Sequence, residues 1–181
     1  GLGDVYKRQL LLGASGAVHW FEVPAPTTAA LRELAVASGA STFMTLLAAT
    51  QLLLARYSGE RDVALGAVTS GRARPELDNV VGLLVNTVVL RSDVDEQLTF
   101  RGFLDRVRRT ALDAFDNAEL PFERVVKELA PERNNGGSAL DQVTLTLQNA
   151  PEMSFELPGV DAEPFPLPRE SATRELSLEF T

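Results

Sequence analysis

The stretch VGLLVNTVVLR, residues 81–91, places one polar pair, Asn86 and Thr87, inside an otherwise apolar run. Burying an amide without a partner costs about 1 to 3 kcal/mol, so we expect the Asn86 side chain to have a specific hydrogen-bonding role. Two interpretations are open: a satisfied structural asparagine in a core strand, or a side chain that faces a functional site. The near-continuous apolar character of residues 81–92 is typical of a strand in a sheet covered on both faces.

Helical and strand patterns lie on both sides of this stretch. The 3.6-residue apolar period predicts helices after a Thr27 cap, over 42–57, after a Thr99 cap and from Leu120. Short apolar or alternating runs predict strands over 62–69, 81–92, 142–148 and 175–180. This order of elements favours an α/β (α+β) two-layer sandwich, in which helices pack on a mixed β-sheet.

Two helices have specific expectations for burial. The helix over 42–57 carries apolar residues on all sides, so we expect it to be buried and to anchor the core. The helix that begins near Leu120 is expected to bury Phe122, Val125, Val126 and Leu129. Beyond it, the NNGGS run at 134–138 predicts a flexible loop, and residues 151–168 are proline-rich and extended.

Composition excludes several classes of function. The chain has 181 residues, enough for one domain, and its net charge of −8 gives no support to nucleic-acid binding. It has no cysteine and a single histidine, so we expect no disulfide and no metal site. The longest apolar stretches fall short of the roughly 20 residues that cross a bilayer, so no membrane span is predicted and the expected location is cytoplasmic.

Two further segments, LPFERVV (120–126) and LDQVTLTLQNAP (140–151), follow VGLLVNTVVLR along the chain. In this order and at these separations, the three segments closely resemble the later motifs of the condensation domain of nonribosomal peptide synthetases. The family writes these motifs approximately as (I/V)GxFVNTxxxR, HQDxPFExxV and PLFQVxFxLQN. The resemblance runs from about Trp20 to Leu178, and it implies one chloramphenicol-acetyltransferase-like lobe, one arm of a V-shaped domain with a tunnel between its two lobes.

The resemblance also implies the site residues. Asn86, Thr87 and Arg91 match the first motif and are the candidates for the substrate tunnel, although Arg91 is also a candidate for a strand-end salt bridge. The other motif residues are expected to be mainly structural: Gly82, Pro121, Phe122, Glu123, Gln142, Gln148 and Asn149. Asn117, Ala118 and Glu119 replace the family's usual His-Gln-Asp, a departure that puts the full activity of the parent domain in doubt.

The catalytic HHxxxDG motif of the family is absent from this sequence. The one histidine, His19, lies between Val18 and Trp20 and ahead of the matched motifs. We therefore expect residues 20–181 to be the C-terminal lobe of a condensation domain, truncated at both ends, with no catalytic residue of its own. Residues 1–9 fit nothing in the family and are interpreted as a non-native or artefactual leader.

In this family, the acceptor amine attacks a donor thioester, and both substrates are tethered to phosphopantetheine arms of carrier proteins. The resemblance therefore implies upstream and downstream peptidyl carrier domains, the missing N-terminal lobe and an adjacent adenylation domain as partners, with no bound cofactor. The isolated chain is predicted to be inactive. The alternatives are a non-catalytic carrier-protein docking module and a stand-alone acyltransferase that uses coenzyme A. The sequence does not identify the amino acids that are joined.

Overall fold

The structure, a computed structural model, describes residues 15–72, 74–129, 140–148, 159, 165, 171–172 and 174–181. The leader at 1–9, Asn149, the loop at 134–138 and nearly all of 151–168 lie outside the described residues. The described elements, in chain order, are α2 (Ala25–Ala37), α3 (Thr42–Ser58), β1 (Asp62–Thr69), a 3-10 turn η1 (Pro75–Leu77), β2 (Asn86–Asp93), α4 (Phe100–Asp116), α5 (Phe122–Leu129), β3 (Val143–Leu147) and β4 (Leu176–Phe180).

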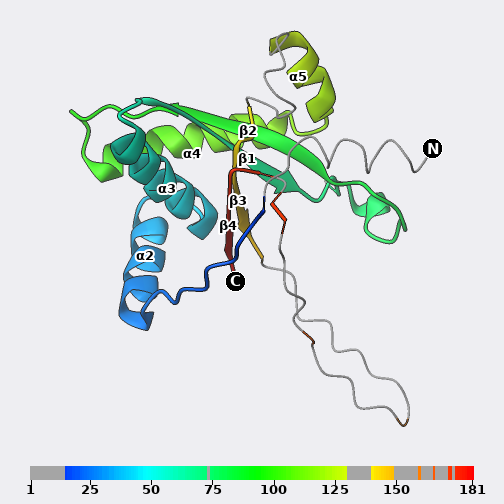
Figure 1. Ribbon diagram of the computed structural model, residues 1–181, viewed down its shortest axis with the longest axis horizontal. Coiled ribbons are helices and arrows are strands. Elements are labelled where there is room, and N and C mark those ends of the chain that lie inside the picture. The colour runs from blue at the N-terminus through cyan, green and yellow to red at the C-terminus, as the bar shows by residue number, and fades with distance from the viewer. Residues whose placement is uncertain are drawn as a thin grey trace.

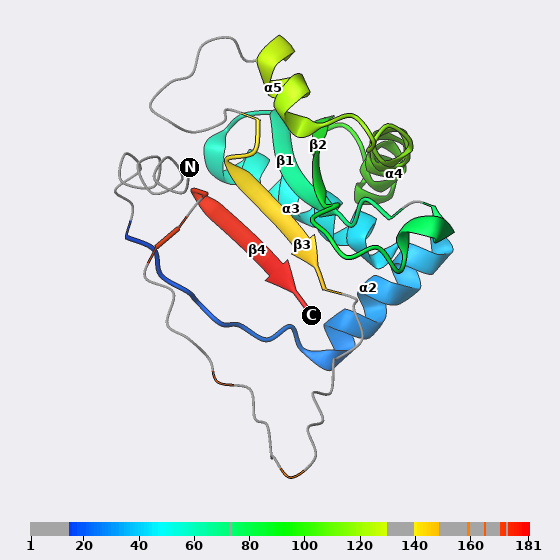
Figure 2. The same cartoon turned by 90° about the vertical axis from the view of Figure 1, so that its right-hand side faces the viewer.

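The described strands form one four-stranded mixed sheet in the order β2-β1-β3-β4 (Figure 1). Strand β1 pairs antiparallel with β2, with Leu65 opposite Leu90, and parallel with β3, with Gly66 opposite Thr144. Strand β4 then pairs parallel with β3. Residues 15–24 run beside β4 in Figure 2. The Phe21 ring packs edge to face against the Phe180 ring, with the ring centroids 6.0 Å apart. The predicted mixed sheet packed by helices is confirmed.

Local capping interactions explain where the two core helices begin. The Ser41 hydroxyl accepts a hydrogen bond from the Met44 amide at 3.2 Å at the start of α3. The Thr99 hydroxyl accepts one from the Gly102 amide at 3.2 Å at the start of α4, so the predicted Thr99 cap is confirmed. The predicted Thr27 cap is wrong, because α2 already begins at Ala25, with a proline in its first turn and no side-chain cap.

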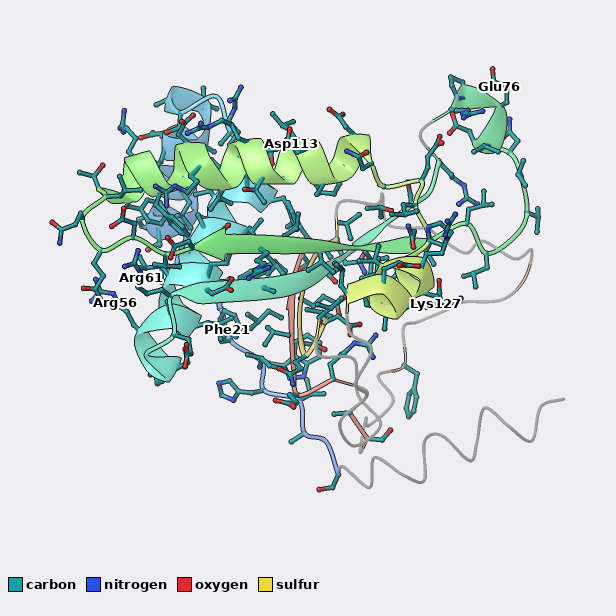
Figure 3. All side chains as sticks on the ribbon, turned by 90° about the horizontal axis from the view of Figure 1, so that it is seen from above. Phe21, Arg56, Arg61, Glu76, Asp113 and Lys127 are labelled. Atoms are coloured by element: carbon teal, nitrogen blue, oxygen red, sulfur yellow. The ribbon has the colours of Figure 1, made fainter. Side chains whose placement is uncertain are left out.

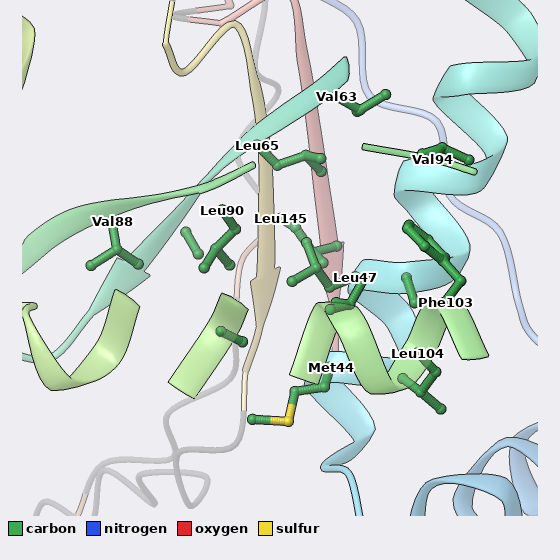
Figure 4. Close-up of a cluster of buried hydrophobic side chains, with 14 residues drawn as sticks. Met44, Leu47, Val63, Leu65, Val88, Leu90, Val94, Phe103, Leu104 and Leu145 are labelled. Carbon is green, nitrogen blue, oxygen red and sulfur yellow. The ribbon is translucent and has the colours of Figure 1, made fainter. Parts of the chain in front are cut away.

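The core lies between the sheet and helices α3 and α4 (Figure 4). Its largest fully buried apolar side chains come from both layers, and each such leucine contributes about 1.5 to 3 kcal/mol when it leaves water. They are Leu47 of α3, Leu65 of β1, Leu90 of β2, Leu104 and Val107 of α4, and Leu145 of β3. The contacts of three strands with two helices thus hold the two layers together.

Three predictions about burial are wrong. Residues 81–85 do not extend the strand, because β1 ends at Thr69, which pairs with Asn86, and earlier residues have no strand to pair with. Val81 and Leu83 are therefore 100% and 89% exposed. Helix α3 is not buried all round, since Leu53 faces away from the core and is 53% exposed. In α5 only Val126 is buried, and Leu129 is 69% exposed.

The sheet is covered by helices on one face only. Strand residues alternate between faces, and the buried apolar side chains, such as Leu65 and Leu90, point to α3 and α4. We call the other side the open face, and by register it carries Ala64, Gly66, Val68, Thr87, Val89, Arg91, Thr144, Thr146, Ser177 and Glu179. Most of these side chains are small or carry a hydroxyl group. The expectation of a sheet covered on both faces is therefore wrong for the part of the chain that is described.

No single helix in the described ranges has the length and apolar character to cross a membrane. Helices α2 and α3 meet that test only when they are taken together, across a bend of 107° between them.

A buried amide joins α3 to the two strands beneath it. Gln51 is fully buried, and its Nε2 donates to the Leu90 carbonyl at 3.0 Å and to the Val63 carbonyl at 3.4 Å. Because Val63 belongs to β1 and Leu90 to β2, one side chain ties the helix to the antiparallel pair. In the sequence, this residue stands out only as a break in an apolar run.

We expect Gln51→Met to lower the free energy of unfolding by about 1 to 3 kcal/mol, because it removes the donor and leaves buried carbonyl groups with fewer partners. Methionine keeps a similar length, so the change tests the hydrogen bonds more than the packing. Urea denaturation of both proteins measures the difference. Leu53→Met, at an exposed position of the same helix, is the control and should change little. An equal loss in both variants would contradict the role of the Gln51 amide.

Candidate functional site

The Asn86 side chain holds the connection between α4 and α5. Its Nδ2 donates to the Ala118 carbonyl at 2.8 Å and to the Leu120 carbonyl at 2.7 Å, and its Oδ1 accepts from the Phe122 amide at 3.1 Å. The expected hydrogen-bonding role of this amide is thus present, and its partners are backbone groups. Asn86 stands at the first residue of β2, so it joins the end of the sheet to the first turn of α5.

Thr87 lies on the open face, beside the centre of the sheet. Gly66 of β1 has no side chain there, and a Cβ at this position would stand 3.5 Å from Thr87 Cγ2, 3.3 Å from Thr144 Cγ2 and 3.0 Å from Asp141 Cβ. The last two distances are tighter than ordinary van der Waals contact, so glycine lets β3 approach β1 closely. The side chains of Thr87, Thr144 and Asp141 therefore come together over Gly66 on the open face.

Arg91 forms a salt bridge at the far end of β2, as one of its two interpretations predicted. Its Nε donates to Asp62 Oδ1 at 2.7 Å and its Nη2 donates to Asp62 Oδ2 at 2.5 Å. The hydrogen bonds from Arg91, helped by its charge and opposed by desolvation, hold the pKa of Asp62 below its ordinary value. The pair is exposed, with 70% of the Arg91 side chain and 55% of the Asp62 side chain accessible.

The remaining motif residues make local contacts. Phe122 donates its amide to Asn86, and the Pro121 carbonyl accepts from the Arg124 amide at 2.9 Å at the start of α5. Gln142 and Gln148 lie at the two ends of β3, where the Gln142 carbonyl accepts from the Glu175 amide and Gln148 Nε2 donates to Glu179 Oε1. Glu123 lies in the first turn of α5 and is exposed. At Gly82 a Cβ would meet nothing within 4 Å, so packing does not require glycine there.

An apolar loop projects from the end of the molecule that carries Asn86. In Figure 3 the η1 segment with Glu76 lies at the opposite end from Arg56 of α3. The following residues expose four apolar side chains within six positions: Val80, Val81, Leu83 and Val85. Gly71 (φ +65°) supports this loop, because a Cβ there would collide with the Leu84 carbonyl oxygen. The loop is therefore bent back on itself while its apolar side chains stay in solvent.

Two polar residues near the open face, Asp141 and Arg174, were not among the residues predicted from sequence. Asp141, just before β3, is 1% exposed and forms an ion pair with Arg174, just before β4, at 2.6 Å. The sequence did contain a sign that Asp141 is unusual, because the family motif PLFQV has phenylalanine at the position where this chain has Asp141. Within the described ranges, no three acidic or histidine side chains gather closely enough to bind a metal ion.

We expect Asn86→Asp to loosen the first turn of α5, because a carboxylate cannot donate to the Ala118 and Leu120 carbonyls and repels both oxygens. Amide hydrogen exchange should speed up at Arg124, whose amide donates to the Pro121 carbonyl in this turn, whereas the Phe122 amide can still donate to the new carboxylate. The same change at the exposed loop residue Asn79, Asn79→Asp, is the control and should leave α5 unchanged. Unchanged protection of Arg124 in the Asn86→Asp variant would contradict the role of the Asn86 donor.

The Arg91 and Asp62 pair predicts a pH-dependent contribution to stability. Because the folded-state pKa of Asp62 is lowered, its stabilisation is present above the ordinary aspartate value and is lost as the pH falls through the lowered pKa. Asp62→Asn should therefore be slightly less stable than the parent chain at pH 7, and the two should converge in urea denaturation as the pH falls below the ordinary aspartate value and through the lowered pKa. The loss should be small and should shrink in salt, because the pair is exposed. A difference that is constant with pH, or one matched by Glu96→Gln at an exposed loop position, would contradict this assignment.

Comparison with known proteins places this arrangement in a family. The family model described as Condensation domain matches residues 13–179. Chondramide synthase cmdD from Chondromyces crocatus is 43% identical over 144 residues, which is 80% of this chain and 4% of that protein. Phosphinothricin tripeptide synthetase PhsC from Streptomyces viridochromogenes is 40% identical over 147 residues, 81% of this chain and 14% of that protein. The chain therefore spans only a small part of such relatives.

Solved structures agree with the fold. A four-domain nonribosomal peptide synthetase bound to AMP and glycine matches 88% of this chain and 13% of its own, with a TM-score of 0.79 at 22% identity. The first condensation domain of the calcium-dependent antibiotic synthetase matches 78% of this chain and 32% of its own, with a TM-score of 0.67 at 21% identity. The fold is thus of the chloramphenicol-acetyltransferase-like type. Together with the family model and the relatives above 30% identity, it establishes that this chain belongs to the condensation domain family of nonribosomal peptide synthetases.

Proposed function

We propose that this chain is the C-terminal lobe of a condensation domain that forms an amide bond between carrier-tethered aminoacyl or peptidyl thioesters. The observation that carries the proposal is the family match over residues 13–179, in which the three motifs hold the positions described above. The match to a single solved condensation domain covers 32% of that chain, which supports a lobe of the domain, with most of its structure supplied by other residues.

We propose that the open face is the side of this lobe that borders the substrate tunnel. It bears hydroxyl groups from three strands, at Thr87, Thr144, Thr146 and Ser177, and no helix of the core covers it. Such groups can bind amide and carbonyl oxygens of an extended substrate without adding charge. Thr87 is the tunnel candidate that this geometry favours most. Asn86 would act beside it by holding the α4–α5 connection, and Arg91 is placed at the far end of the same strand.

The proposed reaction joins two tethered partners. The amine of the acceptor attacks the carbonyl carbon of the donor thioester, the C–N bond forms, the C–S bond breaks, and the thiol of the donor carrier leaves with a proton. Holding both partners in line can supply several kcal/mol of such a barrier. A base for the amine proton is still needed, and His19, the one histidine of the chain, lies between Val18 and Trp20 and is not part of an HHxxxDG motif. The proton-handling histidine would therefore come from the N-terminal lobe.

The partners in this proposal follow from the family. They are the peptidyl carrier domains upstream and downstream, whose phosphopantetheine arms deliver both substrates, the N-terminal lobe, and an adjacent adenylation domain. No cofactor is proposed to be bound by the lobe itself. The exposed apolar loop with Val81 and Leu83 supports an extensive contact with another part of the same domain, because apolar patches in solvent usually mark interfaces. A cytoplasmic location stays a prediction.

We expect the purified chain to form no amide product from two loaded carrier proteins. When it is fused to the N-terminal lobe of the matching PhsC condensation domain, it should form product detectable by mass spectrometry. The physical reason is that the fused lobe supplies the HHxxxDG histidine and the second wall of the tunnel. Product from the isolated chain above a no-protein control would refute its predicted inactivity.

The fusion with its second motif histidine changed to alanine is the matched control, and it should lose the product. A folded fusion that yields none with loaded carriers would contradict the assignment of this chain as a working lobe. It would favour the alternative, a non-catalytic docking module, whose mark is carrier binding without turnover.

A further inference from the structure

We infer that the buried ion pair between Asp141 and Arg174 sets the register of the parallel strands β3 and β4. The Asp141 side chain is 2% exposed, and the Arg174 side chain is 37% exposed. Charged pairs at the surface contribute little, but a charge this deeply buried is costly unless its partner is present. The pair can therefore discriminate against any arrangement that separates its members.

The apolar pattern of the two strands does not define a unique register. Strand β3 reads VTLTL and β4 reads LSLEF, so both alternate apolar and polar residues. A shift by one residue would turn every apolar side chain to the wrong face, but a shift by two would again place apolar beside apolar. The connection between the strands spans residues 148–175, too long for a tight turn to impose the pairing. Another interaction must distinguish the observed register from its two-residue alternatives.

Polar pairs follow the observed register. Val143 lies opposite Leu176, and the same offset places Thr144 opposite Ser177, whose hydroxyl groups are 3.0 Å apart. Carried back to the residues just before the two strands, that offset places Asp141 opposite Arg174, in agreement with their 2.6 Å contact. After a two-residue shift in either direction, Asp141 would face Ala172 or Leu176. Its buried carboxylate would then lack the guanidinium as a partner. The Thr144 and Ser177 hydroxyl groups, in contrast, would still have hydroxyl or carboxylate groups as neighbours.

The register matters for the open face. It places Ser177 beside Thr144, which itself lies opposite Gly66 of β1, and Glu179 beside Thr146. A slipped β4 would still bury its apolar residues and would move Ser177 and Glu179 along this face by two positions. Asp141 and Arg174 are thus positioning residues for the open face. This inference concerns the folding of the chain and does not depend on the reaction proposed above.

The absence of native cysteine makes the register directly measurable by disulfide formation in the full 181-residue chain. Cysteines at Thr144 and Ser177 report the observed register, and cysteines at Thr146 and Ser177 report a two-residue slip. Disulfides need Cβ atoms about 3.5 to 4.5 Å apart, so each pair oxidises efficiently only in its own register. We expect the parent chain to cross-link the first pair and not the second.

The decisive variants remove one charge or both. Arg174→Met, which leaves the buried Asp141 carboxylate without its guanidinium, should lower Tm by about 6 to 12 °C, whereas Asp93→Leu, which breaks the exposed Arg61 pair, should lower it by no more than about 4 °C. Asp141→Leu should lower Tm less than Arg174→Met, because the Arg174 side chain is 37% exposed and stays in contact with water. The double variant Asp141→Leu with Arg174→Met should regain most of the lost Tm, because an apolar pair needs no buried counter-charge. The motif PLFQV, with its apolar residue at this position, indicates that leucine fits there.

The double variant also separates a register role from simple packing. The quantity to measure is the yield of the slipped Thr146 and Ser177 cross-link divided by the yield of the Thr144 and Ser177 cross-link. In the double variant this ratio should be about tenfold or more above its value in the parent chain, because each 1.4 kcal/mol of lost discrimination between the two registers changes the ratio tenfold. Two results would overturn the inference. One is an unchanged Tm in Arg174→Met, and the other is a stable double variant whose slipped cross-link is no more frequent than in the parent chain.

Discussion

The structure depends on one constraint: the sheet buries a single face. Leucines from α3, α4 and the three strands β1, β2 and β3 meet on that side, and the hydrophobic effect of this layer supplies most of the driving force for folding. The opposite side has small and hydroxyl-bearing residues, which can stay in contact with water and can also pack against a partner. One-sided burial therefore stabilises the fold and at the same time leaves one face of the sheet without a core helix over it in the part of the chain that is described.

Three sets of polar side chains fix the geometry that the apolar core leaves undefined. Gln51 ties α3 to β1 and β2, Asn86 ties β2 to the α4–α5 connection, and Asp141 with Arg174 relates β3 to β4. Hydrophobic contacts are non-directional, so they tolerate shifts along a strand or a helix. The hydrogen bonds and ion pairs of these side chains are directional, and polar groups removed from water are costly when unpaired, so each set favours one arrangement over its near neighbours.

The predictions from sequence succeeded where a pattern was local. Helix α3, helix α4 with its Thr99 cap, and strand β1 lie within a residue or two of the expected positions, because periodicity and capping act over a few residues. The prediction of strand over 81–85 failed, since a strand needs a partner and Thr69 is the last residue of β1 available for pairing. The burial predicted for the apolar face of α5 failed in part, because Val126 is buried but Leu129 is 69% exposed. Both failures leave apolar residues exposed.

The sequence by itself determined the family, the mixed α/β architecture and the need for Asn86 to have hydrogen-bond partners, since motif order, residue periodicity and the cost of a buried amide can all be read along the chain. Only the tertiary structure decided which partners those are, that Arg91 pairs with Asp62, and that Asp141 meets Arg174. The physical reason is that each of these contacts joins residues about 30 or more positions apart. Their meeting depends on the strand order and on the register of the sheet, which no local pattern encodes.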